Sequence, residues 1–235
     1  MTYLRFALLL MAVVLTAAPL SAQTDEVEYR MDVGAGLGTS YYWGDVNTGM
    51  YKNAGFAAAL STRFILNSRM AVKAMLGRNA IKGSTADVKN VYPSDLSGMG
   101  ASTPLEYSFS GNVTDLSVMY ELNFWPYGYE RGYLGLSRIT PFIQLGLGAS
   151  YSDVDKTFTA NVPLGLGVKY KVGPRLNLAL DWTVHFTMSD NIDGLSAPYG
   201  VTSSGFKNKD AYFTTLLTLT YDIAPRCITC NKDKR

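Results

Sequence analysis

The fold is decided by the stretch Thr114–Phe124, which reads TDLSVMYELNF. Every second side chain is apolar or weakly polar, while those between are mostly polar and include the acids Asp115 and Glu121. A period of two predicts a β-strand with two unlike faces. One such strand fits either a soluble β-sandwich or a membrane β-barrel, so the remaining strands must separate these two folds.

The composition sets the broad class of the protein. The chain has 235 residues, of which 47% are hydrophobic and 17% charged, which fits one domain and excludes a disordered tether. Its 22 glycines and 16 tyrosines favour an all-β fold with many turns. The net charge is only +2 and the body holds no basic block, so we expect no nucleic-acid partner.

Residues 1–22 have the pattern of a signal peptide. Arg5 supplies the positive charge, Phe6–Ala18 the apolar core and Ser21–Gln23 the small-residue cleavage region, so we expect the mature chain to begin near Gln23. An uncleaved anchor is the alternative. No cysteine follows the apolar core, so a lipoprotein is not indicated. After Gln23 no apolar run approaches the ~20 residues of a spanning helix, which predicts export without a helical anchor.

The same alternation recurs along the mature chain and predicts about eight strands. Their expected ranges are Tyr29–Tyr41, Ala54–Phe64, Met70–Gly77, Leu105–Phe124, Ile139–Tyr151, Val162–Val172, Leu176–Phe186 and Ala211–Tyr221. We expect Gly111 to bend or bulge the fourth of them. The connections differ in length. Turns are expected at Asn67–Arg69 and Gly173–Arg175, loops at Trp43–Asn53, Asn79–Pro104 and Thr187–Lys209, an aromatic connector at Trp125–Arg138 and a tail at Asp222–Arg235.

The positions of the charges favour a membrane barrel over a sandwich. All charged residues within the predicted strands share the glycine-rich polar face: Arg30, Asp32, Arg63, Lys73, Asp115, Glu121, Lys169, Lys171 and Asp181. A lipid-facing wall requires this, because a basic side chain at mid-bilayer costs ~2 to 4 kcal/mol. Sandwich cores exclude charge as well, but their strands usually have about 5 to 6 residues, whereas these reach about 11, close to a tilted bilayer span. We therefore predict an eight-stranded antiparallel transmembrane β-barrel of the outer membrane.

The loop lengths predict the orientation of the barrel. Tight connections after the second and sixth strands and long ones after the third and seventh are typical of periplasmic turns and outer loops, although the connector after the fourth strand is longer than a turn. An even strand count then places both termini in the periplasm. Aromatic residues expected near that boundary are Tyr29, Phe64, Phe124, Tyr170 and Tyr221. Side chains alone can fill so small a barrel, so a porin is not indicated.

His185, the only histidine, raises the question of catalysis. Some small outer-membrane lipid enzymes use a histidine with a serine and an acid, and Ser189 and Asp190 lie nearby in the sequence. The simpler interpretation, which we favour, is a polar histidine inside the barrel, because a catalytic triad is recognised by its geometry. We expect no catalytic residues and no cofactor.

The tail carries a C-x-x-C motif, Cys227 and Cys230, next to Arg226. A zinc ion would need two further ligands, so no metal site is expected. A thioredoxin-like centre needs a βαβ unit that the strand pattern lacks. In an oxidising compartment the two sulfurs would form a local disulfide or a bond to a partner, and both alternatives stay open.

Three motifs resemble the PorG-type outer-membrane proteins of Bacteroidota. They are Tyr29–Gly34 continuing to Tyr41–Asn47, the run Pro163–Tyr170, and Thr187–Ser196, and the likeness covers nearly all of the mature chain. The resemblance implies a non-enzymatic component of the type IX protein secretion system, with a role in gliding in some relatives. It also implies that the barrel anchors a periplasmic ring, made by a PorK-like lipoprotein and its PorN-like partner, amid outer-membrane lipid and lipopolysaccharide.

Both the residues and the resemblance place the connector and the tail within reach of a periplasmic partner. The expected partner-binding residues are Cys227, Cys230, Arg226, Trp125 and Tyr127. Two alternatives remain. One is an outer-membrane lipid-modifying enzyme that uses His185, and the other is an adhesion or stability barrel that acts through its two long loops.

Overall fold

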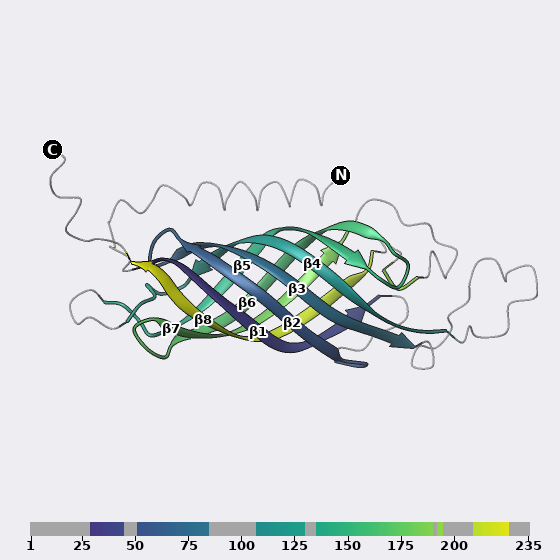
Figure 1. Cartoon of the computed structure of the whole chain (residues 1–235), viewed down its shortest axis with the longest axis horizontal. Helices are drawn as coiled ribbons and strands as arrows, with labels where there is room; N and C mark the ends of the chain where they lie inside the picture. Colours follow the sequence, from purple (N-terminus) through teal and green to yellow (C-terminus); the bar gives the residue numbers. More distant parts are fainter. Residues whose placement is uncertain are drawn as a thin grey trace, which may run out of the picture.

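Eight antiparallel strands form a closed barrel in which each strand pairs with its sequence neighbours and β8 returns to β1 (Figure 1). The computed structural model describes residues 29–44, 51–84, 107–129, 135–189, 192–194 and 209–225. The strands are β1 Tyr29–Trp43, β2 Gly55–Ile65, β3 Met70–Ser84, β4 Ser108–Asn123, β5 Ile139–Ser152, β6 Phe158–Lys171, β7 Leu176–Thr187 and β8 Ala211–Pro225. None of the described residues forms a helix long and apolar enough to cross a membrane.

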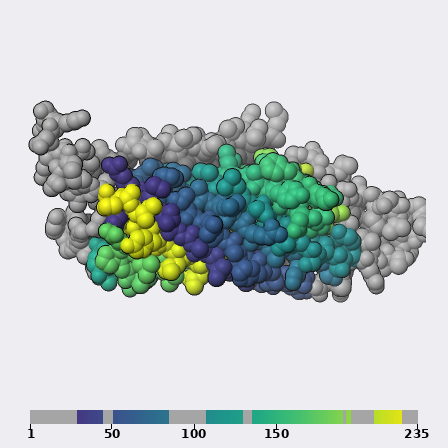
Figure 2. Space-filling model, viewed as in Figure 1, coloured from purple at the N-terminus to yellow at the C-terminus, as the bar shows by residue number. Residues whose placement is uncertain are grey.

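The barrel closes along the seam between β1 and β8, which lie side by side in Figure 2 as purple and yellow atoms. The pairing runs from Tyr29 opposite Pro225 to Trp43 opposite Ala211. Glycine allows the two backbones to approach, because a Cβ at Gly38 would lie 1.9 Å from the Thr215 carbonyl oxygen. Complete closure leaves no strand edge, and a bilayer can surround only such a sheet.

The pleat separates the side chains as the alternation predicts. Leucines face outward with large exposed fractions, 59% for Leu37, 62% for Leu60 and 58% for Leu116. The interior holds Asp32, Arg63, Lys73, Asp115, Glu121, Lys169, Lys171 and Asp181, all buried. An apolar outer wall around a polar interior is the arrangement of a transmembrane β-barrel. The predicted fold class is confirmed.

Arg30 is the exception to the predicted charge placement. It is exposed, whereas Tyr29 beside it is buried. The β1–β2 pairing begins only at Met31 opposite Phe64, so Arg30 precedes the part of β1 that is enclosed on both sides. Arg30 is therefore exposed at the end of the barrel and not enclosed in the lumen, because a side chain is enclosed only where both neighbouring strands are present.

Three strands extend at least four residues beyond their predicted ranges, β3 and β8 at their ends and β6 at its start, Phe158 instead of Val162. β3 continues to Ser84, so the first residues of the predicted loop Asn79–Pro104 belong to a strand, with Asn79 and Ile81 buried inside. Gly111 pairs with Ile81 in an unbroken ladder, and the expected bulge is absent between β3 and β4. These pairs lie at the end where β3 and β4 extend furthest (Figure 1).

β8 likewise continues past the predicted end at Tyr221. It runs to Pro225, with Asp222 turned into the interior, where it accepts from Lys171. Residues 222–225 are therefore part of the barrel wall, and the tail begins at residue 226.

The two ends of the barrel have different connections. The turn end carries the tight turns between β2 and β3 and between β6 and β7, which are closed by Leu66 N to Met70 O at 3.0 Å and Val172 N to Leu176 O at 2.9 Å. It also holds the connector between β4 and β5, the start of β1 and the end of β8. The opposite end, called the loop end here, holds the connections that follow β1, β3, β5 and β7. Both predicted tight turns are confirmed.

Candidate functional site: the two ends of the lumen

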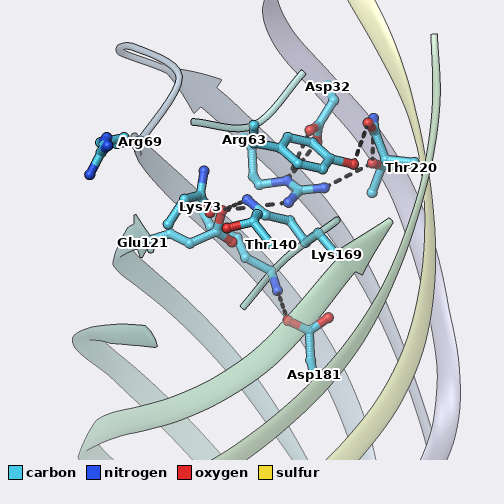
Figure 3. Close-up of polar contacts among 12 residues, drawn as sticks. Asp32, Arg63, Arg69, Lys73, Glu121, Thr140, Lys169, Asp181 and Thr220 are labelled. Atoms are coloured by element: carbon cyan, nitrogen blue, oxygen red, sulfur yellow. Dashed lines mark hydrogen bonds and ion pairs between the residues drawn. The ribbon is translucent and has the colours of Figure 1, made fainter. Parts of the chain in front are cut away.

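A network of ion pairs fills the lumen near the turn end, and Glu121 of β4 lies at its centre (Figure 3). Glu121 is fully buried, pairs with Lys169 of β6 and lies 3.5 Å from Nη1 of Arg63. Arg63 of β2 also pairs with Asp32 of β1 at 2.9 Å, and its Nη2 donates to Thr220 of β8 at 2.9 Å. The Glu121 carboxylate and the Arg63 guanidinium therefore connect side chains from five strands, β1, β2, β4, β6 and β8.

Two more buried pairs extend the network. Lys73 of β3 donates to Asp181 of β7 at 2.8 Å, and Lys171 pairs with Asp222. The carboxylates Asp32, Glu121, Asp181 and Asp222 thus match the cations Arg63, Lys73, Lys169 and Lys171 in number. Buried charges are tolerated when they are paired and hydrogen-bonded, so these eight side chains can lie together inside the barrel without a net charge.

Tyr127 of the connector closes the turn end from below this network. Its hydroxyl donates to Asn177 at 2.9 Å, and Lys169 Nζ lies 5.0 Å from the centre of its ring. Its backbone amide donates to the carbonyl oxygen of Ser68 at 2.8 Å, which ties the connector to the β2–β3 turn. Burial raises the pKa of the Tyr127 phenol well above its usual range. The Tyr127 side chain therefore covers the turn end of the lumen.

Trp125 occupies a different position. Its side chain is 51% exposed, while its backbone amide donates to Thr140 Oγ1 at 3.0 Å. The connector residues predicted to bind a partner are thus separated: the Trp125 side chain is presented outside the barrel, and the Tyr127 side chain turns inward. The other predicted partner-binding residues, Arg226, Cys227 and Cys230, lie outside the described residues. The structure does bring Pro225, the residue before them, to the turn end.

His185 lies inside the lumen, nearer the loop end, and is fully buried. Its ring stacks on Tyr212 with 4.4 Å between ring centres and 6° between planes. Nε2 lies 3.5 Å from Thr214 Oγ1, and Nδ1 has no hydrogen-bond partner among the described residues. Ser189 lies beyond the end of β7, and Asp190 is outside the described residues. This is the environment of a packed interior histidine.

A short segment of the β7–β8 connection, Ile192–Gly194, folds back into the loop end and caps it. The Tyr42 hydroxyl donates to Asp193 Oδ2 at 2.7 Å and also bonds to Asp210. The Ile192 amide donates to Asp210 Oδ2 at 3.1 Å, and the Ile192 side chain is buried. The cap packs on an apolar cluster: Tyr42, Ile81, Phe109, Val113, Ile192 and Tyr212. The sequence predicted only a loop here, and the signal for the cap was one apolar residue, Ile192, between polar neighbours.

Neither end of the lumen has the geometry of a metal centre. Within the described ranges no three His, Cys, Asp or Glu side chains lie close enough to hold a metal ion. The acidic groups at the loop end, Asp193 and Asp210, instead accept from Tyr42.

Comparisons with known proteins identify one matching family and several solved structures of similar fold. The family described as "Domain of unknown function (DUF6089)" matches residues 5–232. No curated protein matches the sequence. Among solved structures, Neisserial surface protein A is 11% identical with a TM-score of 0.46, over 82% of this chain and 97% of that one. Ail, the attachment invasion locus protein of Yersinia pestis, is 13% identical with a TM-score of 0.45, over 84% and 100%. The outer membrane enzyme PagL is 13% identical with a TM-score of 0.39, over 82% and 99%.

Proposed function

The chain belongs to the DUF6089 family, and we propose that this member is a non-enzymatic outer-membrane component of the type IX secretion machinery. Its barrel anchors a periplasmic ring complex, built by a ring lipoprotein and its partner, to the outer membrane. The turn end faces the periplasm, and the ring binds there through Trp125 and the tail that carries Cys227 and Cys230.

The observation that carries this proposal is a lumen filled with paired charges. Lys73 of β3 reaches Asp181 of β7 across the interior at 2.8 Å, while Arg63 pairs with Asp32 on the neighbouring strand at 2.9 Å. Side chains alone can fill a barrel of eight strands, so the barrel acts as a rigid body rather than as a channel. Rigidity is what an anchor requires, because a ring held by a deformable wall would not keep its position.

The position of the chain ends supports the same role. Tyr29 pairs with Pro225, so the first and last strands both end where the tight turns lie. Short turns are typical of the periplasmic side of outer-membrane barrels. A tail that begins directly after Pro225 then starts in the compartment of the ring. The assignment to the type IX system itself rests on the likeness of Tyr29–Gly34, Pro163–Tyr170 and Thr187–Ser196 to PorG-type proteins.

The surroundings of His185 favour a non-enzymatic barrel over a lipid-modifying enzyme. The ring is fully buried, stacks on Tyr212 and lies behind the Ile192–Gly194 cap. A general base must come within hydrogen-bond reach of the group it deprotonates, and a lipid substrate lies outside the wall. The position of His185 therefore favours a packing role over catalysis on a lipid substrate.

The first test removes residues 226–235 and leaves β8 intact. We expect the truncated chain to reach the outer membrane and fold, but to lose co-purification of the ring lipoprotein. A Cys227→Ser/Cys230→Ser variant serves as the matched control, since it keeps the tail and its charges. Loss of a higher band on non-reducing gels in that variant would assign the sulfurs to a bond with the partner. A normal ring and normal secretion after the truncation would contradict the proposal.

A second test addresses the connector. Trp125→Ala is compared with Trp43→Ala, which removes a similarly exposed indole, 43% against 51%, from the loop end. Aromatic anchors dominate protein interfaces, so we expect Trp125→Ala to weaken recovery of the ring lipoprotein by about fivefold or more. Trp43→Ala should leave the recovery unchanged. Equal recovery with both variants would remove Trp125 from the interface.

A further inference from the structure

The two tight turns of the turn end are copies of each other. In each, the arginine is the residue before the next strand, Arg69 before β3 and Arg175 before β7. The arginine carbonyl oxygen accepts an amide from a neighbouring strand in both, from Asn123 at 2.7 Å and from Asp222 at 2.8 Å. With the closing bonds at 3.0 and 2.9 Å given above, the same backbone geometry therefore holds both arginine side chains.

The two turns lie on opposite sides of the barrel. One joins β2 to β3 and the other β6 to β7, and in a closed ring of eight strands these hairpins are four strands apart. One compact protein domain that contacts one side of the rim would meet only one of them. A bilayer surrounds the barrel and meets both.

Both arginine side chains lie outside the lumen, at the lower edge of the apolar wall. Figure 3 places Arg69 apart from the interior network. Its Nη1 lies 3.4 Å from the carbonyl oxygen of Phe124, whose side chain is 55% exposed. Arg175 lies beside Tyr221, which is 46% exposed. A guanidinium beside exposed aromatic rings has the position of an interfacial residue, where the hydrocarbon ends and the lipid headgroups begin.

The Arg175 guanidinium contacts two phenols. Its Nε donates to Tyr29 Oη at 3.0 Å and its Nη1 lies 3.4 Å from Tyr221 Oη. Because each phenol oxygen accepts from the guanidinium, each phenol keeps its own proton to donate. Nη2 adds further N–H donors. The exposed guanidinium keeps N–H donors that these two contacts do not use, and arginine binds phosphate oxygens in a two-point geometry.

The distribution of exposed charge separates the two ends. Among the described residues, the charged side chains that reach the surface of the turn end are all arginines: Arg30, Arg69, Arg138 and Arg175. Those of the loop end have mixed sign: Lys52, Arg78, Lys82, Asp153, Asp155, Lys156 and Lys209. There Arg78 even pairs with Asp153 at 3.8 Å. Within the described ranges, the turn end thus presents only cations to an anionic surface, whereas the loop end presents both signs.

We propose that Arg69 and Arg175 each bind the phosphate of a glycerophospholipid, one on each side of the barrel. The two sites fix the depth and the tilt of the barrel in the membrane. That the lipids belong to the periplasmic leaflet rests on the orientation in the proposed function, whereas the binding itself needs no protein partner.

The test measures lipid retained by the purified full-length chain after release from micelles that contain phosphatidylglycerol, by native mass spectrometry. We expect up to two tightly retained lipids in the native chain. Since a cation near an anionic lipid surface contributes about one kcal/mol, Arg69→Gln and Arg175→Gln should each weaken retention of one lipid by about fivefold. Arg175→Lys should keep part of the effect, because lysine holds phosphate as a point charge. Arg78→Gln, an exposed arginine of the loop end, is the matched control.

Several outcomes would overturn the proposal. Equal retention by the native chain, Arg69→Gln/Arg175→Gln and Arg78→Gln would do so, as would displacement of the lipid by millimolar inorganic phosphate. Preferential retention of lipid A over phosphatidylglycerol would assign the sites to the other leaflet and reject the glycerophospholipid. If a variant does not fold, the native chain with ¹⁵N-labelled arginine in bilayers still decides the matter. Dipolar coupling of guanidinium nitrogen to lipid ³¹P is then expected, and its absence rejects the sites. Neither measurement involves the ring, so failure here leaves the anchoring role untouched.

Discussion

The two ends of the lumen are built by different chemistry on one sheet. Near the turn end, Glu121, Arg63 and Lys169 form the centre of a balanced charge network that joins strands across the interior. Near the loop end, His185 stacks on Tyr212, and the Ile192–Gly194 cap covers an apolar cluster. The first end depends on electrostatic pairing between buried side chains, and the second on packing and single hydrogen bonds. Loss of one group should therefore cost far more at the turn end.

The largest effect is expected for Glu121→Ala. Glu121 is fully buried and accepts from Lys169 while it lies 3.5 Å from Arg63, so its removal leaves Lys169 without its counter-charge and Arg63 with Asp32 alone. Breaking one buried pair in this way costs about 3 to 5 kcal/mol. We expect the free energy of unfolding, measured by urea titration of the barrel in lipid vesicles, to fall by that amount.

The control for this prediction combines Glu121→Ala with Lys169→Met. The double variant removes both members of the closest pair and so should recover much of the lost stability, because no unpaired ammonium remains. Stability of the double variant that equals or falls below that of Glu121→Ala alone would mean that the deficit comes from the cavity and not from the charge.

Tyr42→Phe is the corresponding change at the loop end. It removes the hydroxyl that donates to Asp193 and bonds to Asp210, which together hold the cap. Hydrogen bonds to charged groups contribute about 1.5 to 3 kcal/mol, so we expect a smaller loss than for Glu121→Ala. Amide hydrogen exchange should rise at Ile192, whose amide donates to Asp210. Unchanged exchange there would show that the cap does not depend on Tyr42.

His185→Leu should have a still smaller effect. The substitution keeps most of the side-chain volume and removes the stacking on Tyr212, an interaction worth about 0.5 to 1.5 kcal/mol. We expect normal insertion and normal secretion with a slightly lower urea midpoint. A variant of full stability that lost a lipid hydrolase or acyltransferase activity of the native chain would instead make His185 catalytic.

The alternation of residues was enough to predict the closed barrel and the inward placement of Lys73, Glu121 and Asp181. The prediction works wherever a strand has neighbours on both sides, because the pleat then fixes each side chain to one face. It does not extend to Arg30, which is not enclosed because β2 does not reach it. It also missed the extension of β3 to Ser84, because Gly83 and the polar residues around it look like a loop, although their partners on β4 hold them in the ladder.

Features outside the ladder could not be read from the sequence. The cap depends on Asp193 meeting Tyr42, which lies 151 positions away, and no local pattern reports such a pair. The connector has no periodicity, so nothing in the sequence separates Tyr127, which turns into the lumen, from the exposed Trp125. Which arginine faces which neighbour at the rim likewise follows from the turn geometry and not from composition.

An effect as small as that of His185→Leu is expected from Tyr127→Phe, which tests whether the connector belongs to the turn-end network. The change removes only the hydroxyl that donates to Asn177, so near neutral pH we expect a loss of about 0.5 to 1.5 kcal/mol. Burial raises the pKa of this phenol, so the native chain keeps its full contribution below the unfolded value of about 10 and loses it as pH rises toward the higher folded value. Phenylalanine has no proton to lose. The difference between the two urea midpoints should therefore shrink above pH ~10. A difference that stays constant at higher pH would mean that Tyr127 is open to water and does not cover the turn end of the lumen.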